Sequence, residues 1–301
     1  MGGWLTTAGP RRGSTALVIG VLAAIAAAGC SSAAGSGAAT AQGTAQGSPA
    51  QAVALAATAA GTVNSFTATV GLDLTMINST TGNQRVTVSG TVSEAVRPST
   101  LAEFSFDTLQ VAGVSLPGGM SEIVTPNEIY LKQSDLSMLL HTSKQWFGLS
   151  VSSVSGRGGL NLNSLLGESD TSNPLTQAQL LAGATDVQKA GTGTVDGVAV
   201  TEYSGSYALS AAIAKLPANV RSSVNPAFKQ AGLQSGTAQF TVWIDAQHIV
   251  RKDITALSSS TFNETLTTTV TSVNQPVNIT APSAGQVYPL SVSDLGSLWS
   301  A

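Results

Sequence analysis

The sequence predicts an α+β fold: one large, curved antiparallel β-sheet, shaped as a half-barrel, with a few helices covering its concave face. Two observations lead to this fold class. Apolar and polar side chains alternate with a period of two from Phe66 onward, which is typical of strands with one buried and one wet face. Helical patterns are few and short, and turn residues separate the alternating segments.

The composition narrows the function by exclusion. Of the 301 residues, 13 are Lys or Arg and 16 are Asp or Glu, so 10% are charged, whereas soluble domains average about 25%. The net charge of −3 argues against a nucleic-acid partner. A single cysteine and two histidines exclude a disulfide framework and a Cys- or His-rich metal centre. We therefore expect no cofactor and no metal site.

The N-terminus has the pattern of a targeting segment. Arg11 and Arg12 precede an uncharged apolar run at residues 16–28, which is too short to span a bilayer and has the size of a signal-peptide core. Small residues lead directly into Cys30, as in a bacterial lipobox, where the cysteine is acylated and becomes the mature N-terminus. We expect a signal peptide at 1–29 and lipidation of Cys30; the alternative is an ordinary secretory signal that leaves a free thiol.

A tether and one domain follow the signal peptide. Residues 30–50 consist, after Cys30, of Ala, Gly, Ser, Thr, Gln and one Pro, which predicts a flexible linker. No later stretch reaches the roughly 18 apolar residues of a transmembrane helix. We therefore expect a domain at 51–292 and a tail at 293–301, held on the outer face of the cell membrane by acyl chains alone.

The first elements of the domain are one helix and three strands. Residues 51–63 have helical composition with a stop at Gly61, and the alternation from Phe66 to Met76 predicts a long strand. Turn residues at 78–83 lead to a partner strand. In the third strand the apolar parity changes between Phe106 and Leu109, which predicts a β-bulge that curves the sheet.

The rest of the domain repeats this strand pattern around two short helical regions. A Ser-, Gly- and Asn-rich stretch at 152–174 separates the two halves, and Asp196-Gly197 is a strong signal for a two-residue hairpin. We expect further strands at 122–124, 128–132, 145–151, 186–194, 198–207, 238–244, 249–257 and 261–273, and helices at 176–183 and at 210–233, the latter interrupted at Pro217 and Pro226.

Several segments, taken in order and spacing, resemble the mycobacterial LppX/LprAFG-type lipoproteins. The matching segments are Cys30 with its tether, residues 129–132 (IYLK) with 144–147 (KQWF), 195–198 (VDGV) with 201–203 (TEY), 242–245 (VWID) with 250–251 (VR), and 277–282 (VNITAP) as a last strand. The resemblance implies an actinobacterial relative with a fold similar to LolA and LolB, in which helices close a half-barrel over an apolar cavity. It also implies a lipid or lipoglycan ligand and an envelope transporter as partner.

The candidate site is the apolar face of the first three strands. We expect the lining of a lipid cavity to comprise Phe66, Val70, Leu72, Leu74, Met76, Val86, Val88, Phe104 and Phe106. A packed core would show the same alternation, so this alternative stays open. The small side chains of Ala68 and Gly90 within the face favour open space over packing.

The sequence contains no recognisable catalytic motif. No nucleophile elbow, P-loop or zinc-protease motif is present, and we interpret His141 and His248 as surface residues and Glu168 and Asp170 as a solvated pair. A pocket that combined either histidine with a carboxylate and a hydroxyl would indicate an enzyme. We expect a lipid-anchored envelope lipoprotein that binds or transfers a lipid without catalysis; the alternative is a surface interaction or assembly subunit whose core is filled.

Overall fold

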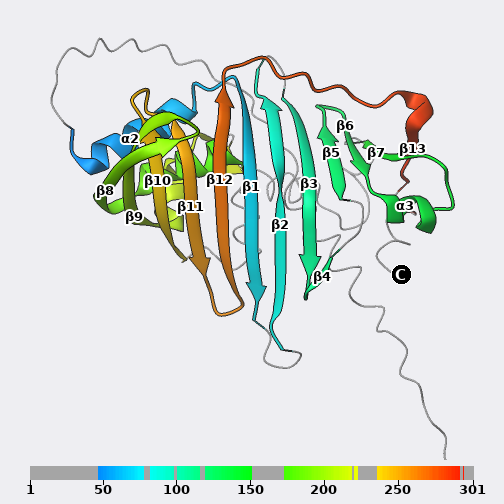
Figure 1. The fold of residues 1–301 in the computed structure, drawn as a ribbon, viewed down its shortest axis with the longest axis horizontal. Helices are drawn as coiled ribbons and strands as arrows, with labels where there is room; N and C mark the ends of the chain where they lie inside the picture. Colours follow the sequence, from blue (N-terminus) through cyan, green and yellow to red (C-terminus); the bar gives the residue numbers. More distant parts are fainter. Residues whose placement is uncertain are drawn as a thin grey trace, which may run out of the picture.

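In a computed structural model, the chain forms one large sheet with helices packed against it (Figure 1). The structure describes residues 47–77, 82–97, 100–115, 119–150, 173–218, 220–222, 236–291 and 294. The strands are β1 (Ser65–Met76), β2 (Gln84–Ala95), β3 (Leu101–Val111), β4 (Val114–Ser115), β5 (Met120–Val124), β6 (Glu128–Lys132), β7 (Trp146–Ser150), β8 (Thr185–Val195), β9 (Val198–Ala208), β10 (Thr237–Asp245), β11 (Val250–Ser258), β12 (Phe262–Val273) and β13 (Val287–Pro289).

The sheet joins all thirteen strands in the order β13-β7-β6-β5-β3-β2-β1-β12-β11-β10-β9-β8, with β4 paired to β3. Every pair is antiparallel except β13 with β7. Figure 1 shows the sheet curling at its β8–β9 end. The predicted fold class, a large curved antiparallel sheet with few helices, is confirmed.

Four helical segments gather at the β8–β10 end of the sheet: α2 (Pro49–Ala60), α6 (Pro174–Leu180), η1 (Leu181–Gly183) and α7 (Leu209–Lys215). The other two described helices, α3 (Ser134–Leu139) and η2 (Ala284–Gln286), lie beside β7 and β13 at the other edge (Figure 1). The α2, α6, η1 and α7 helices contact one another, and together they pack against β8 and β9. Their apolar side chains form one buried cluster with β9, β10 and β11, which includes Val53, Leu180, Tyr207 and Phe240.

Local sequence signals explain where these helices begin and end. The Ser48 hydroxyl accepts a hydrogen bond from the backbone N–H of Gln51, and Pro49 occupies the first turn, where a missing N–H costs nothing. The α7 helix ends at Lys215, two residues before Pro217, as the sequence predicts. The α3 helix was not predicted, because its six residues are too few for a periodic pattern.

Asn173 ties α6 to the sheet. Its side-chain oxygen accepts from the backbone N–H of Leu175 at 2.8 Å and so caps the helix. Its side-chain amide donates to Glu94 on β2 at 2.7 Å, and Glu94 is fully buried. One side chain therefore serves both the helix terminus and a buried carboxyl group.

The predicted bulge in the third strand is present, and Gly90 faces it. On β2, Ser89 pairs with Thr108 while Gly90 pairs with Phe106, so Asp107 of β3 is the extra residue. A Cβ atom at Gly90 would lie 2.2 Å from the carbonyl oxygen of Ser105. Gly90 therefore sits in tight contact with β3, and our expectation that it provides open space is wrong.

The expected last strand at residues 277–282 is also wrong. Those residues adopt no strand; after Asn274 the chain runs along one end of the sheet to the opposite edge, where β13 pairs with β7 (Figure 1). Pro276 and Pro282 lack the N–H that a ladder needs. The side chain of Lys144 donates to the carbonyl oxygen of Gly285 and fastens the end of this crossing.

Several predictions concern residues that the structure does not describe. These are the signal peptide at 1–29, Cys30, most of the tether at 30–50 and of the tail at 293–301, and the Glu168/Asp170 pair. Within the described ranges, no helix is long and apolar enough to cross a bilayer.

The close approach at Gly90 gives a stability prediction. We expect Gly90→Ala to lower the free energy of unfolding by about 2 kcal/mol or more, because the methyl group would overlap the Ser105 carbonyl and force β2 and β3 apart. Chemical denaturation measures this change. Gly71→Ala is the matched control, since a Cβ at Gly71 meets nothing within 4 Å; equal effects of the two substitutions would contradict the tight contact.

Candidate functional site

The predicted lining residues lie together on one face of the sheet. Of these residues, the following belong to the buried part of one apolar cluster: Phe66, Val86, Val88, Phe104 and Phe106. The remaining four, Val70, Leu72, Leu74 and Met76, are half-buried and pack against that cluster. The structure thus brings the predicted residues together; that they line a lipid cavity stays a prediction.

Strand register explains why these side chains meet. Leu72 lies opposite Val88 on β2 and opposite Leu266 on β12, so the apolar rows of three strands continue across the sheet. On β3, the Phe104 and Phe106 rings stack with their centroids 6.1 Å apart. The result is a continuous apolar surface on the face that carries the helices.

This surface is covered unevenly. At the helix-bearing end Phe66 and Ala68 are almost fully buried, whereas from Val70 to Met76 the same face of β1 is only half-buried. The apolar face therefore continues past its buried part toward the end of the sheet where β1 turns into β2.

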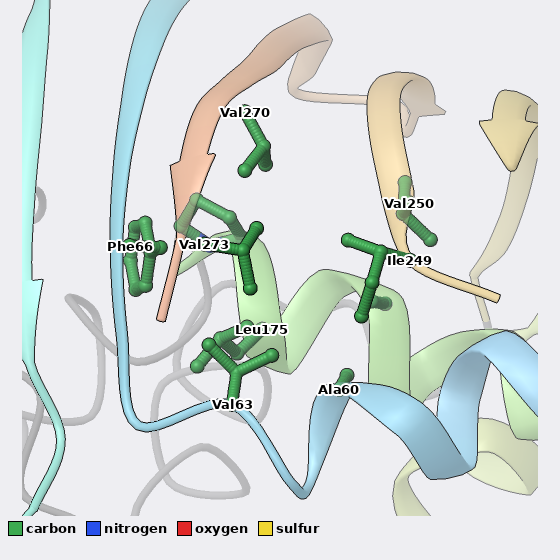
Figure 2. Close-up of a pocket in the computed structure, with 10 residues that line it drawn as sticks. Ala60, Val63, Phe66, Leu175, Ile249, Val250, Val270 and Val273 are labelled. Atoms are coloured by element: carbon green, nitrogen blue, oxygen red, sulfur yellow. The ribbon is translucent and has the colours of Figure 1, made fainter. Parts of the chain in front are cut away.

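A small cavity lies where the helices meet the covered end of the face (Figure 2). Its volume is about 20 Å³, enough for a single water molecule and far too small for an acyl chain. Every labelled side chain around it is apolar, with Ala60 and Leu175 on the helix side and Phe66, Val270 and Val273 on the sheet side. At this end, α2 and α6 fill the space above the sheet.

A buried carboxyl group interrupts the apolar surface on β5. Glu122 is 3% exposed and lies between Phe104 of β3 and Leu131 of β6 in the register of the sheet. Among the described residues, no charged or hydrogen-bonding partner contributes to its pKa shift. Desolvation raises the pKa of Glu122 to about 8, so the group is largely protonated at neutral pH.

A second polar group lies on β11 and β12, between the two apolar clusters. We call Asp253, Thr255, Thr268 and Glu264 the polar seam. The Thr255 hydroxyl donates to the Asp253 carboxyl group at 3.0 Å, and Asp253 lies opposite Thr268, whose buried hydroxyl has no hydrogen-bond partner. Burial raises the pKa values of Asp253 and Glu264 to about 7 each.

Tyr207 faces the seam from β9. The residue is 1% exposed, and its ring lies 6.0 Å from that of Phe240. Burial, followed by the nearby Asp253 carboxylate, raises the pKa of its phenol far above the ordinary value. The phenol therefore stays protonated and available as a hydrogen-bond donor beside the seam.

Sequence reasoning missed all of these buried polar groups. In residues 250–258 the apolar residues Ile254 and Ala256 share one parity and Leu257 the other, so the sequence does not show which face Asp253 joins. The register with β10 decides it, because Asp253 pairs with buried Val242. The only available signal was the position of single acids within strands, which alone does not indicate burial.

The histidines occupy the predicted surface positions, and one of them borders a groove. His141 and His248 are both exposed. His248 lies beside Asp245 and threonine hydroxyls in an open groove, the combination that would indicate an enzyme.

The carboxylate in this groove is already engaged. Asp245 accepts from the backbone N–H groups of Gln247 and Ile249, both at 2.9 Å, and from the Arg251 guanidinium at 2.6 Å. The imidazole of His248 hydrogen-bonds to none of these groups, so the arrangement lacks an oriented base. In the described part of the chain, no group of Cys, His, Asp and Glu side chains has the geometry of a metal site.

Comparison with known proteins gives likenesses of fold only. No family model and no curated protein matches the sequence. Among solved structures, the lipoprotein LppX from Mycobacterium tuberculosis is 20% identical, with 78% of this chain and 100% of LppX covered and a TM-score of 0.41. LprF from Mycobacterium bovis is 13% identical, with 78% and 97% covered and a TM-score of 0.46.

A third solved structure shows a weaker likeness. A putative outer membrane lipoprotein-sorting protein domain from Vibrio parahaemolyticus is 7% identical, with 71% of this chain and 87% of that domain covered and a TM-score of 0.22. At such identities and TM-scores, membership of the LppX/LprAFG family stays a prediction, and the fold class rests on the sheet itself.

The buried carboxyl groups predict a pH dependence of stability. Because Glu122, Asp253 and Glu264 have pKa values near 7 to 8 in the folded state and near 4 when unfolded, the unfolded state binds fewer protons between these values. The contribution of these three groups to the free energy of unfolding should therefore be greatest below about pH 4 to 5. It should fall by a few kcal/mol as the pH rises to about 8.5.

Denaturant titrations across this pH range measure the effect. Glu122→Gln should remove a large share of the fall, because the amide keeps the size of the side chain and does not ionise. Asp107→Asn, at an exposed position of β3, is the control and should leave the fall intact. A stability that is flat or rises over this range would contradict the burial of these carboxyl groups.

Proposed function

We propose that this protein is a lipid-anchored lipoprotein of the cell envelope that binds an amphiphile on the apolar face of its sheet and performs no chemistry on it. One observation carries the proposal: the apolar face runs from a buried part at Phe66 to a half-buried part at Leu72, Leu74 and Met76. A sheet whose core was simply filled would bury this whole row, since exposed apolar area is unfavourable by about 25 cal/mol per Å².

The geometry fits an acyl chain better than a compact ligand. The half-buried row extends along β1 and lies beside Val86 and Val88 of β2, which are buried. Such a long strip matches an extended hydrocarbon, and transfer of each CH₂ group out of water contributes about 0.8 kcal/mol. The wet face of the same strands carries Thr67, Thr69 and Thr75, so only one side of the sheet would contact the chain.

The anchor and location follow from the lipobox pattern at Cys30. An acylated Cys30 would hold the domain at the outer face of the cell membrane through the neutral tether, within reach of lipids in that leaflet. The names of the neighbours LppX and LprF, which are lipoproteins, are in line with this proposal. An envelope transporter as partner stays an expectation from the sequence resemblance.

The alternative is a surface interaction or assembly subunit with no ligand. The tightly filled space around the small cavity between α2, α6 and the sheet favours this reading for the covered end. The half-buried end of the face is where the two functions differ, so the decisive substitutions belong there.

Mass spectrometry of organic extracts from the purified chain tests lipid binding. We expect the Cys30→Ala form to co-purify with lipid and to bind a fluorescent fatty acid. Leu72→Asp should abolish both, because a carboxylate in the strip meets the hydrocarbon without a partner. Leu74→Gln, a milder change, should weaken fatty-acid binding several-fold.

The matched control for this experiment is Thr69→Asp, which adds the same charge to the exposed side of β1. It should retain lipid and bind the probe normally. Two results would exclude this face as the lipid site and favour the filled-core alternative. One is that no lipid co-purifies with the protein that carries only Cys30→Ala. The other is that neither Leu72→Asp nor Leu74→Gln changes fatty-acid binding.

Membrane attachment gives a separate prediction. Cys30→Ala should release the protein from the membrane fraction into the medium, because acyl chains on Cys30 are the proposed anchor and no helix among the described residues is long and apolar enough to cross a bilayer. The intact mass of the unsubstituted protein should exceed that of the chain beginning at Cys30 by the mass of the acyl groups. Retention of Cys30→Ala in the membrane with an unchanged mass would contradict lipidation.

A further inference from the structure

The short α3 helix presents apolar side chains to the outside at one edge of the sheet. Among the described residues, five large apolar side chains are exposed, and two of these, Met138 and Leu139, are neighbours on α3. They are 71% and 44% exposed. Single exposed apolar residues are ordinary on a protein surface, whereas adjacent ones indicate a contact surface. The half-buried row of β1, which carries the proposed function, contains no residue of this helix.

Two further apolar side chains near α3 are partly exposed. Leu140 follows the helix and Trp146 begins β7, and both are half-buried. The ammonium group of Lys132, just before the helix, lies 5.8 Å from the centre of the Trp146 ring. We call the segment 132–146 the α3 corner. It therefore combines aliphatic, aromatic and cationic side chains within fifteen consecutive residues.

Hydrogen bonds hold the α3 corner in this conformation. The backbone N–H of Thr142 donates to the carbonyl oxygen of Ser137 at 3.0 Å, and the Ser137 hydroxyl donates to the carbonyl oxygen of Lys144 at 2.9 Å. His141 adopts the left-handed conformation, with a φ of 49°, that ends a helix in a Schellman motif. Leu136 is buried and fixes the inner side of the helix. The two exposed side chains are therefore held outward by the fold.

The charge of the α3 corner is opposite in sign to that of the whole chain. The segment contains Lys132 and Lys144 against a single acid, Asp135, whereas the chain has a net charge of −3. Asp135 lies in the first turn of α3, where an acid is favoured by the helix dipole. Lys144 donates to the carbonyl oxygen of Gly285, a neutral acceptor that leaves its charge in place. The corner therefore attracts an anionic partner.

This combination of side chains fits the surface of an anionic bilayer. Aliphatic side chains enter the boundary between headgroups and acyl chains, tryptophan prefers the headgroup level, and lysines attract acidic lipids. The core of a protein–protein interface is instead depleted in lysine. Since α3 has only six residues, it is far too short to cross the bilayer, and the contact would stay at the surface.

We propose that the α3 corner docks on an anionic membrane surface, with Met138 and Leu139 inserted among the lipids and the two lysines at the headgroups. Figure 1 shows α3 and α2 at opposite ends of the long axis of the molecule, and the predicted tether enters at α2. Contacts at both ends would lay this axis along the membrane. The proposal rests neither on acylation of Cys30 nor on lipid binding by the β1 row, with which α3 shares no residue.

Co-sedimentation of the Cys30→Ala form with lipid vesicles tests this contact in the absence of the anchor. The probes are phosphatidylcholine vesicles with and without phosphatidylglycerol. We expect tighter binding to the anionic vesicles, and a loss of this difference at high salt, because the lysines act through screened charge. Lys132→Gln should weaken binding to the anionic vesicles about fivefold and leave binding to phosphatidylcholine unchanged.

A second set of variants tests the insertion of apolar side chains. The double variant Met138→Ser with Leu139→Ser should weaken vesicle binding about tenfold or more, because two side chains no longer leave water. Its thermal midpoint should change little, since both positions are exposed. Val114→Ser is the matched control, because Val114 on β4 is 67% exposed and lies outside the α3 corner. This variant should bind the vesicles normally.

Three vesicle results would overturn the proposal. These are no binding to the anionic vesicles, binding that the double variant leaves unaffected, and an equal loss of binding in the double variant and in Val114→Ser. A dimer in sedimentation velocity that the double variant dissociates, without any vesicle binding, would also overturn it and would assign the α3 corner to contact with a second copy of the chain.

Leu72→Asp separates this contact from the proposed function. It should abolish fatty-acid binding and leave vesicle binding intact, because Leu72 lies on β1 and outside the α3 corner. The Met138 and Leu139 double variant should do the reverse. If Leu72→Asp abolished vesicle binding as well, the membrane contact would lie at the β1 row, and the α3 corner would be excluded.

Discussion

The pairing of β1 with β12 is the constraint on which the rest of the structure depends. One half of the sheet, from β13 to β1, is N-terminal in sequence except for β13 itself, and the other half runs from β12 to β8. The two halves meet only at this ladder in the strand order. It extends from Phe66 with Val273 to Met76 with Phe262. A slip of one residue would turn every apolar side chain of β1 to the wet face, so the shared apolar surface exists only in this register.

One irregularity in that ladder helps to hold the register. Between Thr67 and Ala68 the partners on β12 change from Ser272 to Val270, so Thr271 is an extra residue. Its hydroxyl donates to the carbonyl oxygen of Thr67 at 3.0 Å. A bulge fixed by its own side chain pins the register at one point, and together with the bulge at Asp107 it contributes to the curvature of the sheet.

The sequence predicted the strands and the curvature of the sheet better than it predicted the polar side chains that are buried within the strands. The parity change after Phe106 located a bulge correctly, and Asp196-Gly197 forms the expected hairpin, because both signals are local. The β13 strand is formed by a three-residue segment at a distant edge, and no local pattern marks it. Gly90 looked like free space, but its contact with Ser105 depends on the bulge in the neighbouring strand.

The same distinction applies to the candidate site. The apolar row of β1 could be predicted because eleven residues alternate between apolar and polar, and each partner strand shows the same alternation. The burial of Glu122, Asp253 and Thr268 could not be predicted from the sequence, since it follows from their register with Phe104, Val242 and one another on the neighbouring strands. Predicting that such polar side chains are buried requires knowing how the strands of the sheet pair.

Buried polar groups bear on the choice between a filled core and a binding face. A core selected only for stability has little reason to keep the unpartnered Thr268 hydroxyl or the isolated Glu122 carboxyl group, because each costs stability and an apolar residue of similar size would not. Proteins retain such costs where a surface serves binding. The half-buried apolar row of β1 and the two polar interruptions lie on the same face of the sheet. Glu122 aligns with Ala68 through Phe104 and Val92, and Thr268 aligns with Val70. Both therefore border the strip from Leu72 to Met76 at its buried end, beside the place where an amphiphile would lie.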